Sequence, residues 1–165
     1  MIVTKYPEQP VPGVGVVVFK ENNVLVIKRR NPPRKGQWSI PGGKQKLGET
    51  WQDTAKREVR EETGIEIRLI GLVDVVDAII EDDKKNKNGK INRGPLRKKT
   101  NVAYHYTLID CAAYWESGSL MAGSDATEAE WWPIDRLKEL QLWSETERII
   151  QKAKSLRNKE MNVER

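Results

Sequence analysis

The chain has 165 residues and a formal net charge of +5 at pH 7; 38% of its residues are hydrophobic and 32% are charged. This length suits one domain with a hydrophobic core, and the composition excludes a chain that is disordered throughout. It also lacks an apolar run near the roughly 20 residues that a membrane-spanning helix needs, and residues 1–7 lack a signal-peptide pattern.

Two β-branched runs near the N-terminus, residues 14–19 and 24–27, predict a β-hairpin with a polar turn between them. Residues 29–36 contain two prolines and a glycine, so we expect a basic loop there. Residues 50–63 lack proline and glycine and carry many charges, which predicts an exposed helix that ends at Gly64.

The second half of the chain continues the alternation of strands and helices. Residues 65–76 and 102–113 predict two strands, and residues 130–134 predict a short one. Apolar spacing over residues 137–156 predicts a terminal helix with a break near Trp143. Since no repeat or linker separates these elements, we expect the whole chain to form one mixed α/β domain.

The positive charge is concentrated in one segment. Residues 81–99 hold eight basic residues and three acids, so this segment by itself matches the net charge of the chain. A basic segment can attract phosphates, but most charge runs are solvated loops, which is what we expect here. The tail after Asn158 is expected to fray.

The residue types available for a metal site are restricted. With one cysteine, Cys111, and one histidine, His105, the chain cannot assemble a zinc site of Cys and His ligands. Any metal must therefore be held mainly by oxygen, which favours Mg²⁺, with Mn²⁺ as an alternative. We expect His105 to be structural. Residues 13–18 lack the third glycine of a dinucleotide-binding motif, because that position is Val18.

Three glutamates of the predicted helix share one face. At about 100° per residue, Glu58, Glu61 and Glu62 lie within an arc of about 100°. Like charges at this spacing each cost a few tenths of a kcal/mol in a bare helix, which a divalent cation would offset. A surface helix held by salt bridges such as Arg57–Glu61 is the alternative explanation.

The spacing around these glutamates resembles the Nudix box, Gly-x5-Glu-x7-Arg-Glu-U-x-Glu-Glu-x-Gly-U, where U is a bulky aliphatic residue. Residues 43–65 match every specified position, with Val59 and Ile65 as the aliphatic residues. The approach at residues 36–43 and the later Trp131 strand also look like this family. The resemblance implies a hydrolase with an α/β/α sandwich around a mixed sheet, whose catalytic core is the loop and helix of residues 43–65.

By this resemblance, Glu61 and Glu62 would coordinate divalent ions together with the backbone carbonyl of Gly42. Glu58 would be a further ligand or would orient the water that attacks phosphorus. Metal ions held in this way neutralise charge on the phosphates and make bound water a better nucleophile.

The resemblance also implies supporting residues. Arg57 and Glu49 would form a salt bridge that holds the loop on the helix. Family members often add an acidic residue from outside the box, and Glu130, just before Trp131, fits best. The other acidic candidates are Asp125, Glu128 and, as a base, Glu81.

Basic and aromatic residues are candidates for contact with the substrate. Arg29 and Arg30, at the end of the second strand, could hold phosphates, although a solvated strand end is an equal alternative. Trp38 and the pair Trp131 and Trp132 are expected to be core residues more than platforms for a base.

The substrate expected from the resemblance is ADP-ribose, because residues 104–110 and 124–131 look similar to ADP-ribose pyrophosphatases. Nucleoside triphosphates, including oxidised purine ones, and dinucleoside polyphosphates are alternatives. A proline often found downstream of the box in ADP-ribose enzymes is absent, since residues 80–82 are Ile, Glu and Asp.

Two further classes stay open. One is a nucleotide sensor without catalysis, which the intact box disfavours, and the other is an RNA-end processing enzyme that would use the basic residues 84–99. The expected partner is a nucleotide-derived small molecule, with no nucleic acid and no membrane; a homodimer is compatible with the sequence. We expect the protein in the cytoplasm.

Overall fold

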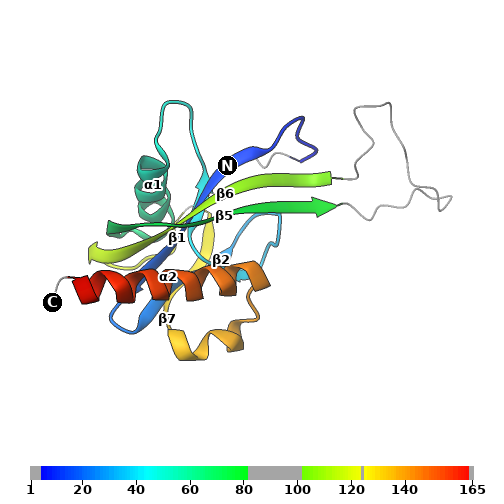
Figure 1. The fold of residues 1–165 in the computed structure, drawn as a ribbon. Coiled ribbons are helices and arrows are strands. Elements are labelled where there is room, and N and C mark those ends of the chain that lie inside the picture. Colours follow the sequence, from blue (N-terminus) through cyan, green and yellow to red (C-terminus); the bar gives the residue numbers. More distant parts are fainter. Residues whose placement is uncertain (1–4, 82–101, 124, 164–165) are drawn as a thin grey trace.

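The computed structural model describes residues 5–81, 102–123 and 125–163. In chain order the elements are β1 (Val11–Lys20), β2 (Asn23–Arg29), β3 (Trp38–Ser39), β4 (Gly42–Lys44), α1 (Trp51–Thr63), β5 (Glu66–Glu81), β6 (Val102–Ser117), β7 (Ala126–Pro133), the 3-10 helix η2 (Ile134–Leu140) and α2 (Ser144–Val163). Figure 1 shows their arrangement. Residues 82–99 of the predicted basic loop lie outside the described residues.

Seven strands of the described chain form one mixed sheet between helices α1 and α2 (Figure 1). The main strand order is β3-β2-β1-β6-β5, while β4 pairs with β1 and β7 pairs with β2. Strands β1 and β6 run parallel, and the other pairs are antiparallel. The predicted α/β/α sandwich around a mixed sheet is confirmed.

The first two strands pair next to their connecting turn and then separate. Phe19 and Lys20 of β1 face Val24 and Asn23 of β2, as the predicted hairpin requires. Farther from the turn, β1 pairs with β4, whereas β2 pairs with β3 and β7. Residues of both separated strands line the pocket that holds the candidate site.

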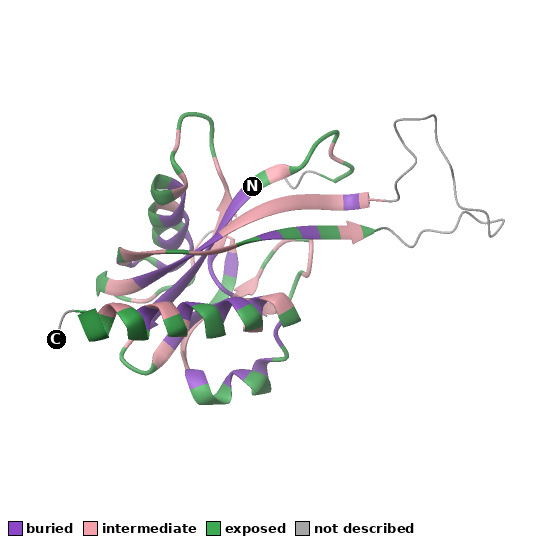
Figure 2. Cartoon of the chain, in the orientation of Figure 1, coloured by how far each residue is buried: buried purple, intermediate pink, exposed green. Residues whose placement is uncertain are grey.

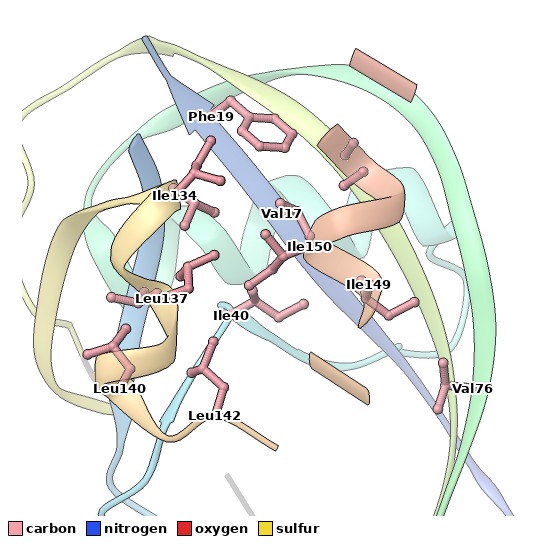
Figure 3. Packing of buried hydrophobic residues seen from close by; sticks show 14 residues of the cluster. Val17, Phe19, Ile40, Val76, Ile134, Leu137, Leu140, Leu142, Ile149 and Ile150 are labelled. Atoms are coloured by element: carbon pink, nitrogen blue, oxygen red, sulfur yellow. The ribbon is translucent and has the colours of Figure 1, made fainter. Parts of the chain in front are cut away.

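Strand β1 is buried on both faces (Figure 2), because its alternate side chains point to opposite sides of a covered sheet. One hydrophobic cluster joins Val16 of β1 to Ala55 and Val59 of α1. The other joins Val17 of β1 to Ile150 of α2, with η2 closing its side (Figure 3). Both helices are therefore anchored on the strand that also forms the floor of the pocket.

Local sequence signals determine both ends of α1. The Thr50 hydroxyl accepts a hydrogen bond from the backbone N–H of Asp53, and the Asp53 carboxylate accepts one from the backbone N–H of Thr50, each at 3.1 Å. This reciprocal capping box satisfies two N–H groups at the start of the helix. Gly64 ends the helix with a φ of 72°, which glycine adopts readily. The predicted helix over residues 50–63 thus agrees with α1 to within one residue.

The predicted strands over residues 65–76, 102–113 and 130–134 correspond to β5, β6 and β7, and each is longer than predicted. Strands β5 and β6 pair from Glu66 to Glu81, well beyond the apolar stretch that signalled them. Hydrogen bonds between the backbones of β5 and β6 extend these two strands, and the pattern of apolar residues does not predict this extension.

The C-terminal region departs from the single interrupted helix predicted over residues 137–156. A 3-10 helix, η2, comes first, and α2 follows after a break near Trp143. Helix α2 also continues past Asn158, where the sequence predicted fraying, and an ion pair of 3.7 Å between Arg68 and Glu160 ties its last turns to β5. No helix in the described parts of the chain is long and apolar enough to cross a membrane.

Candidate active site

Arg57 of α1 binds the loop that precedes the helix. Its guanidinium donates hydrogen bonds to both carboxylate oxygens of Glu49, at 2.6 and 2.9 Å, and to the backbone carbonyl of Lys44, at 3.0 Å. The bonds from Arg57 lower the pKa of Glu49 to about 2. The loop is therefore held on the helix by a charged pair in the place that the sequence predicted.

The same guanidinium contacts two of the three glutamates. Arg57 Nη1 donates to Glu58 at 2.7 Å and to Glu61 at 3.2 Å. Glu58 is buried, whereas the side chain of Glu61 is 46% exposed. Burial raises the pKa of Glu58, and the hydrogen bond from Arg57 opposes that rise. Two carboxylates on one helical face thus have different environments.

Glycine residues bring strand β4 against both α1 and β1. A Cβ atom on Gly43 would collide with the carboxyl group of Glu58, and one on Gly42 would collide with the carbonyl oxygen of Val14. Position 42 therefore needs glycine, because a side chain there would meet the backbone of β1. A side chain at position 43 would displace the carboxyl group of Glu58.

Glu62 is buried where α1 meets β4. Its carboxylate accepts a hydrogen bond of 2.9 Å from the backbone N–H of Gly42, the residue whose carbonyl is a candidate metal ligand. Burial raises the pKa of Glu62 to about 8, the hydrogen bond from Gly42 opposes this, and the charge of Glu58 adds to it. Glu62 is therefore a carboxylate whose negative charge the surrounding protein compensates poorly.

The donor set fits a hard divalent cation, although it is not already arranged around one. Within the described chain, no three acidic, histidine or cysteine side chains lie close enough together to hold a metal ion as they stand. Arg57 holds Glu58 and Glu61 instead. The raised pKa values of Glu58 and Glu62 reflect buried charge that a cation bound by oxygen ligands would offset. These carboxylates therefore suit Mg²⁺ or Mn²⁺.

A pocket lies next to Glu62, between the separated strands β1 and β2. Two guanidinium groups, those of Arg29 and Arg34, line it together with Glu62 and Trp143. Arg34 lies over the ring of Trp143, 3.9 Å from its centroid. Burial lowers the pKa of Arg34, and the charge of Arg29 lowers it further, so the two cations are close enough to repel each other. An anion between them would relieve that repulsion.

A family model for the NUDIX domain matches residues 9–153. The chain belongs to this family. The match includes the loop and helix of residues 43–65 and all strands of the sheet.

Several Nudix proteins are similar to this one. An ADP-ribose pyrophosphatase from Methanocaldococcus jannaschii is 30% identical over 131 residues, which are 79% of this chain and 66% of that protein. An 8-oxo-dGTP diphosphatase from Proteus vulgaris is 38% identical over 65 residues, 39% of this chain and 58% of that protein. The crystal structure of a MutT NUDIX hydrolase from Burkholderia pseudomallei has a TM-score of 0.66 at 26% identity, covering 87% of this chain and 98% of that one. The chain therefore spans less than two thirds of the length of the first two relatives.

Asp125 lies outside the Nudix box but near its glutamates. Its charge raises the pKa of both Glu58 and Glu62, and it lines the same pocket as Glu62. Asp125 accepts a hydrogen bond of 3.0 Å from the side chain of Asn31. The structure thus favours Asp125 as the acidic residue that could join the cluster.

The other acidic candidates lie elsewhere. Glu130 of β7 pairs in register with Val26, whose side chain is in the cluster on the α2 side, so Glu130 faces away from α1. This register argues against the preference for Glu130 that the sequence suggested. Glu128 forms an ion pair of 2.9 Å with Lys28. Glu81 is the last residue of β5 and does not line the pocket, as far as the described residues show.

The remaining substrate candidates separate clearly. Arg30 is not one of the described residues that line the pocket. Its guanidinium donates a hydrogen bond of 3.1 Å to the backbone carbonyl of Ala126. Trp38 lines the pocket and also packs against the hydrophobic cluster that Trp132 contacts, and Trp131 packs against the other cluster. No pattern in the sequence pointed to Arg34 or Trp143 as a pair, because the loop and the helix break that carry them meet only in the folded chain.

Proposed function

We propose that this Nudix protein hydrolyses a pyrophosphate bond in a nucleoside diphosphate linked to another group, with ADP-ribose as its first substrate. One observation carries the proposal: Arg29 and Arg34 line the same pocket as Glu62. Guanidinium groups bind phosphate oxygens in pairs, and buried carboxylates at the same place suit the divalent cation that such a reaction uses. The similarity to an archaeal ADP-ribose pyrophosphatase supports the choice of substrate.

The residues of the candidate site would divide the work of the reaction. Arg29 and Arg34 would bind the two phosphates and hold the anhydride in place. Glu58, Glu61 and Glu62, with the carbonyl of Gly42, would hold Mg²⁺ or Mn²⁺. When bound, the cation neutralises phosphate charge and makes water more acidic.

The bond changes follow from the anhydride. The water oxygen forms a bond to one phosphorus while the bond from that phosphorus to the bridging oxygen breaks, and the bridging oxygen leaves with the other phosphate. From ADP-ribose the products are AMP and ribose 5-phosphate. Glu58 would orient the water and accept its proton, or would serve as a further ligand. Arg57 holds Glu58 for either role through the 2.7 Å hydrogen bond.

The test is a panel of nucleotides: ADP-ribose, diadenosine polyphosphates, and ordinary and oxidised triphosphates. Each is incubated with Mg²⁺, with Mn²⁺ and with a chelator, and the products are separated by chromatography. We expect metal-dependent cleavage of ADP-ribose to AMP. Binding of nucleotides without cleavage under every metal condition would instead indicate a sensor.

An enzyme acting on oxidised nucleoside triphosphates is the second candidate. The 8-oxo-dGTP diphosphatase from Proteus vulgaris favours it, but the similarity covers 39% of this chain. Release of pyrophosphate from an oxidised triphosphate, faster than AMP from ADP-ribose, would select this candidate.

A further inference from the structure

Asp110 of β6 is a buried acid that takes no part in the carboxylate cluster of α1. It is 4% exposed and lines the same pocket as Glu62. Burial is the main influence on its pKa, and no described residue donates a hydrogen bond to its carboxyl group. Its carboxyl oxygens are not among the fully buried side-chain atoms that lack a partner, so they reach the open space of the pocket and have unused capacity for a ligand.

The strand register places Asp110 across β1 from the phosphate end of the pocket. Gly15 of β1 pairs with Gly42 of β4 on one side and with Asp110 of β6 on the other. Gly42 and Asp110 are thus two strand spacings apart, roughly 10 Å. The Asp110 carboxyl lies over Gly15, on the strand between them, and Glu62 lies beside Gly42, so a single nucleotide can contact both Asp110 and the phosphate site.

The glycine at position 15 gives Asp110 its place. A Cβ atom on Gly15 would collide with Oδ1 of Asp110, so the carboxyl group lies over the backbone of β1 where a side chain would otherwise be. At Gly15, the surface of the pocket is therefore formed by a carboxyl group. The aromatic residues Tyr106, Trp38 and Trp143 line the same pocket. Aromatic side chains together with a hydrogen-bond acceptor suit a nucleobase.

Neighbouring charges leave Asp110 unpaired. Arg148 is the nearby cation, but it bonds to Asp74 at 2.7 Å and to Glu145 at 2.8 Å. Asp74 and Glu145 repel a negative charge on Asp110. Asp110 therefore holds an oxygen that can accept an N–H hydrogen bond whether the group is protonated or ionised.

We propose that Asp110 is the residue that recognises the nucleobase, by accepting a hydrogen bond from its exocyclic amino group. This inference rests on the proposed function, under which the base is adenine and the donor is its 6-amino group. The phosphates of the bound nucleotide would then lie near Glu62, and its base would lie near Asp110.

The test is a thermodynamic cycle that removes the amino group and the carboxyl group separately. Dissociation constants are measured by calorimetry for AMP and for purine riboside 5′-monophosphate, which lacks the amino group. The proteins are the unaltered chain, Asp110→Leu, Asp110→Asn and, as a control, Asp135→Leu at an exposed position of η2. Circular dichroism checks that each variant is folded.

The unaltered chain and the control should bind AMP about tenfold more tightly than the analogue. This is the difference in affinity expected from one buried hydrogen bond. Asp110→Leu should bind the two nucleotides equally, and Asp110→Asn, which keeps an acceptor oxygen, should retain most of the preference. Equal weakening of both nucleotides by Asp110→Leu, or no AMP binding by the unaltered chain, would overturn the inference. Because monophosphates are not cleaved, a coupling seen in a chain that fails to hydrolyse ADP-ribose would reject the proposed function alone.

Discussion

Glu62 and Asp110 are buried acids that line one pocket from different elements, α1 and β6. Each has a pKa raised mainly by burial, to about 8 for Glu62 and about 7 for Asp110. A folded protein tolerates such groups when a ligand compensates for them. At the scale of single residues, the site therefore contains two buried carboxyl groups whose negative charge the protein compensates poorly.

Replacing Glu62 with glutamine removes one charged oxygen ligand and keeps the shape of the side chain. We expect turnover of ADP-ribose to fall at least about 100-fold, because metal stabilisation of the transition state is worth several kcal/mol and about 1.4 kcal/mol is a factor of ten. Steady-state kinetics with saturating Mg²⁺ measures this. Glu139→Gln, at an exposed position of η2, is the control and should keep full activity. Unchanged turnover in Glu62→Gln would remove Glu62 from the metal site.

Asp110 predicts a dependence of stability on pH. The pKa of Asp110 is about 7 in the folded chain, and its ordinary value is 3.8. Between these two pH values the carboxyl group is protonated in the folded chain and ionised in the unfolded chain. Stability from this group is therefore lost as pH rises from about 4 to 7, and stays low above that. Asp110→Asn removes the effect, which amounts to a few kcal/mol at about 1.4 kcal/mol per pKa unit.

Thermal unfolding followed by circular dichroism, without nucleotide or metal, measures this prediction. The Tm of Asp110→Asn should exceed that of the unaltered chain by more above pH 7 than near pH 4. A Tm difference that is the same at both ends of this range would show that Asp110 keeps an ordinary pKa.

At the scale of elements, the site depends on the contact between α1 and β4. The helix itself is encoded locally, since Thr50, Asp53 and Gly64 specify its ends in the sequence. The glutamate spacing likewise identified the face that meets β4. The contact with β4 explains why glycine stands at position 43, beside Glu58.

Gly43→Ala should disrupt this contact. The added Cβ would collide with the carboxyl group of Glu58, so this carboxyl group must leave its place beside Arg57. We expect a destabilisation of about 1–3 kcal/mol and a loss of most activity. Gly71→Ala is the matched control, because the nearest atom to its Cβ would be 3.8 Å away, an ordinary contact. Urea unfolding and turnover of both variants are the measurements, and equal behaviour would contradict the proposed packing.

At the scale of the whole molecule, the pocket exists because β1 and β2 separate after their turn. Arg34 and Trp143 lie far apart in sequence and meet only across this opening, so no local pattern could have paired them. The choice between Asp125 and Glu130 has the same origin. Which way Glu130 points depends on the pairing of β7 with β2, and Asp125 lies beyond the irregularity of this pairing that follows Lys28; neither is visible in the spacing of residues. The sequence around Asp110 predicts only an ordinary strand, and the role of Asp110 depends on its pairing with Gly15 in the folded chain.

The central claim is that the carboxylates of α1 and the arginines of the pocket together hydrolyse a phosphoanhydride. The most direct measurement is the cleavage of ADP-ribose in water labelled with heavy oxygen, in the presence of Mg²⁺, with the products weighed by mass spectrometry. We predict AMP and ribose 5-phosphate, with one heavy oxygen atom in one of the two products, and no cleavage once a chelator is added. Intact ADP-ribose bound to the protein after incubation with Mg²⁺ or Mn²⁺ would contradict the claim and point to a nucleotide sensor.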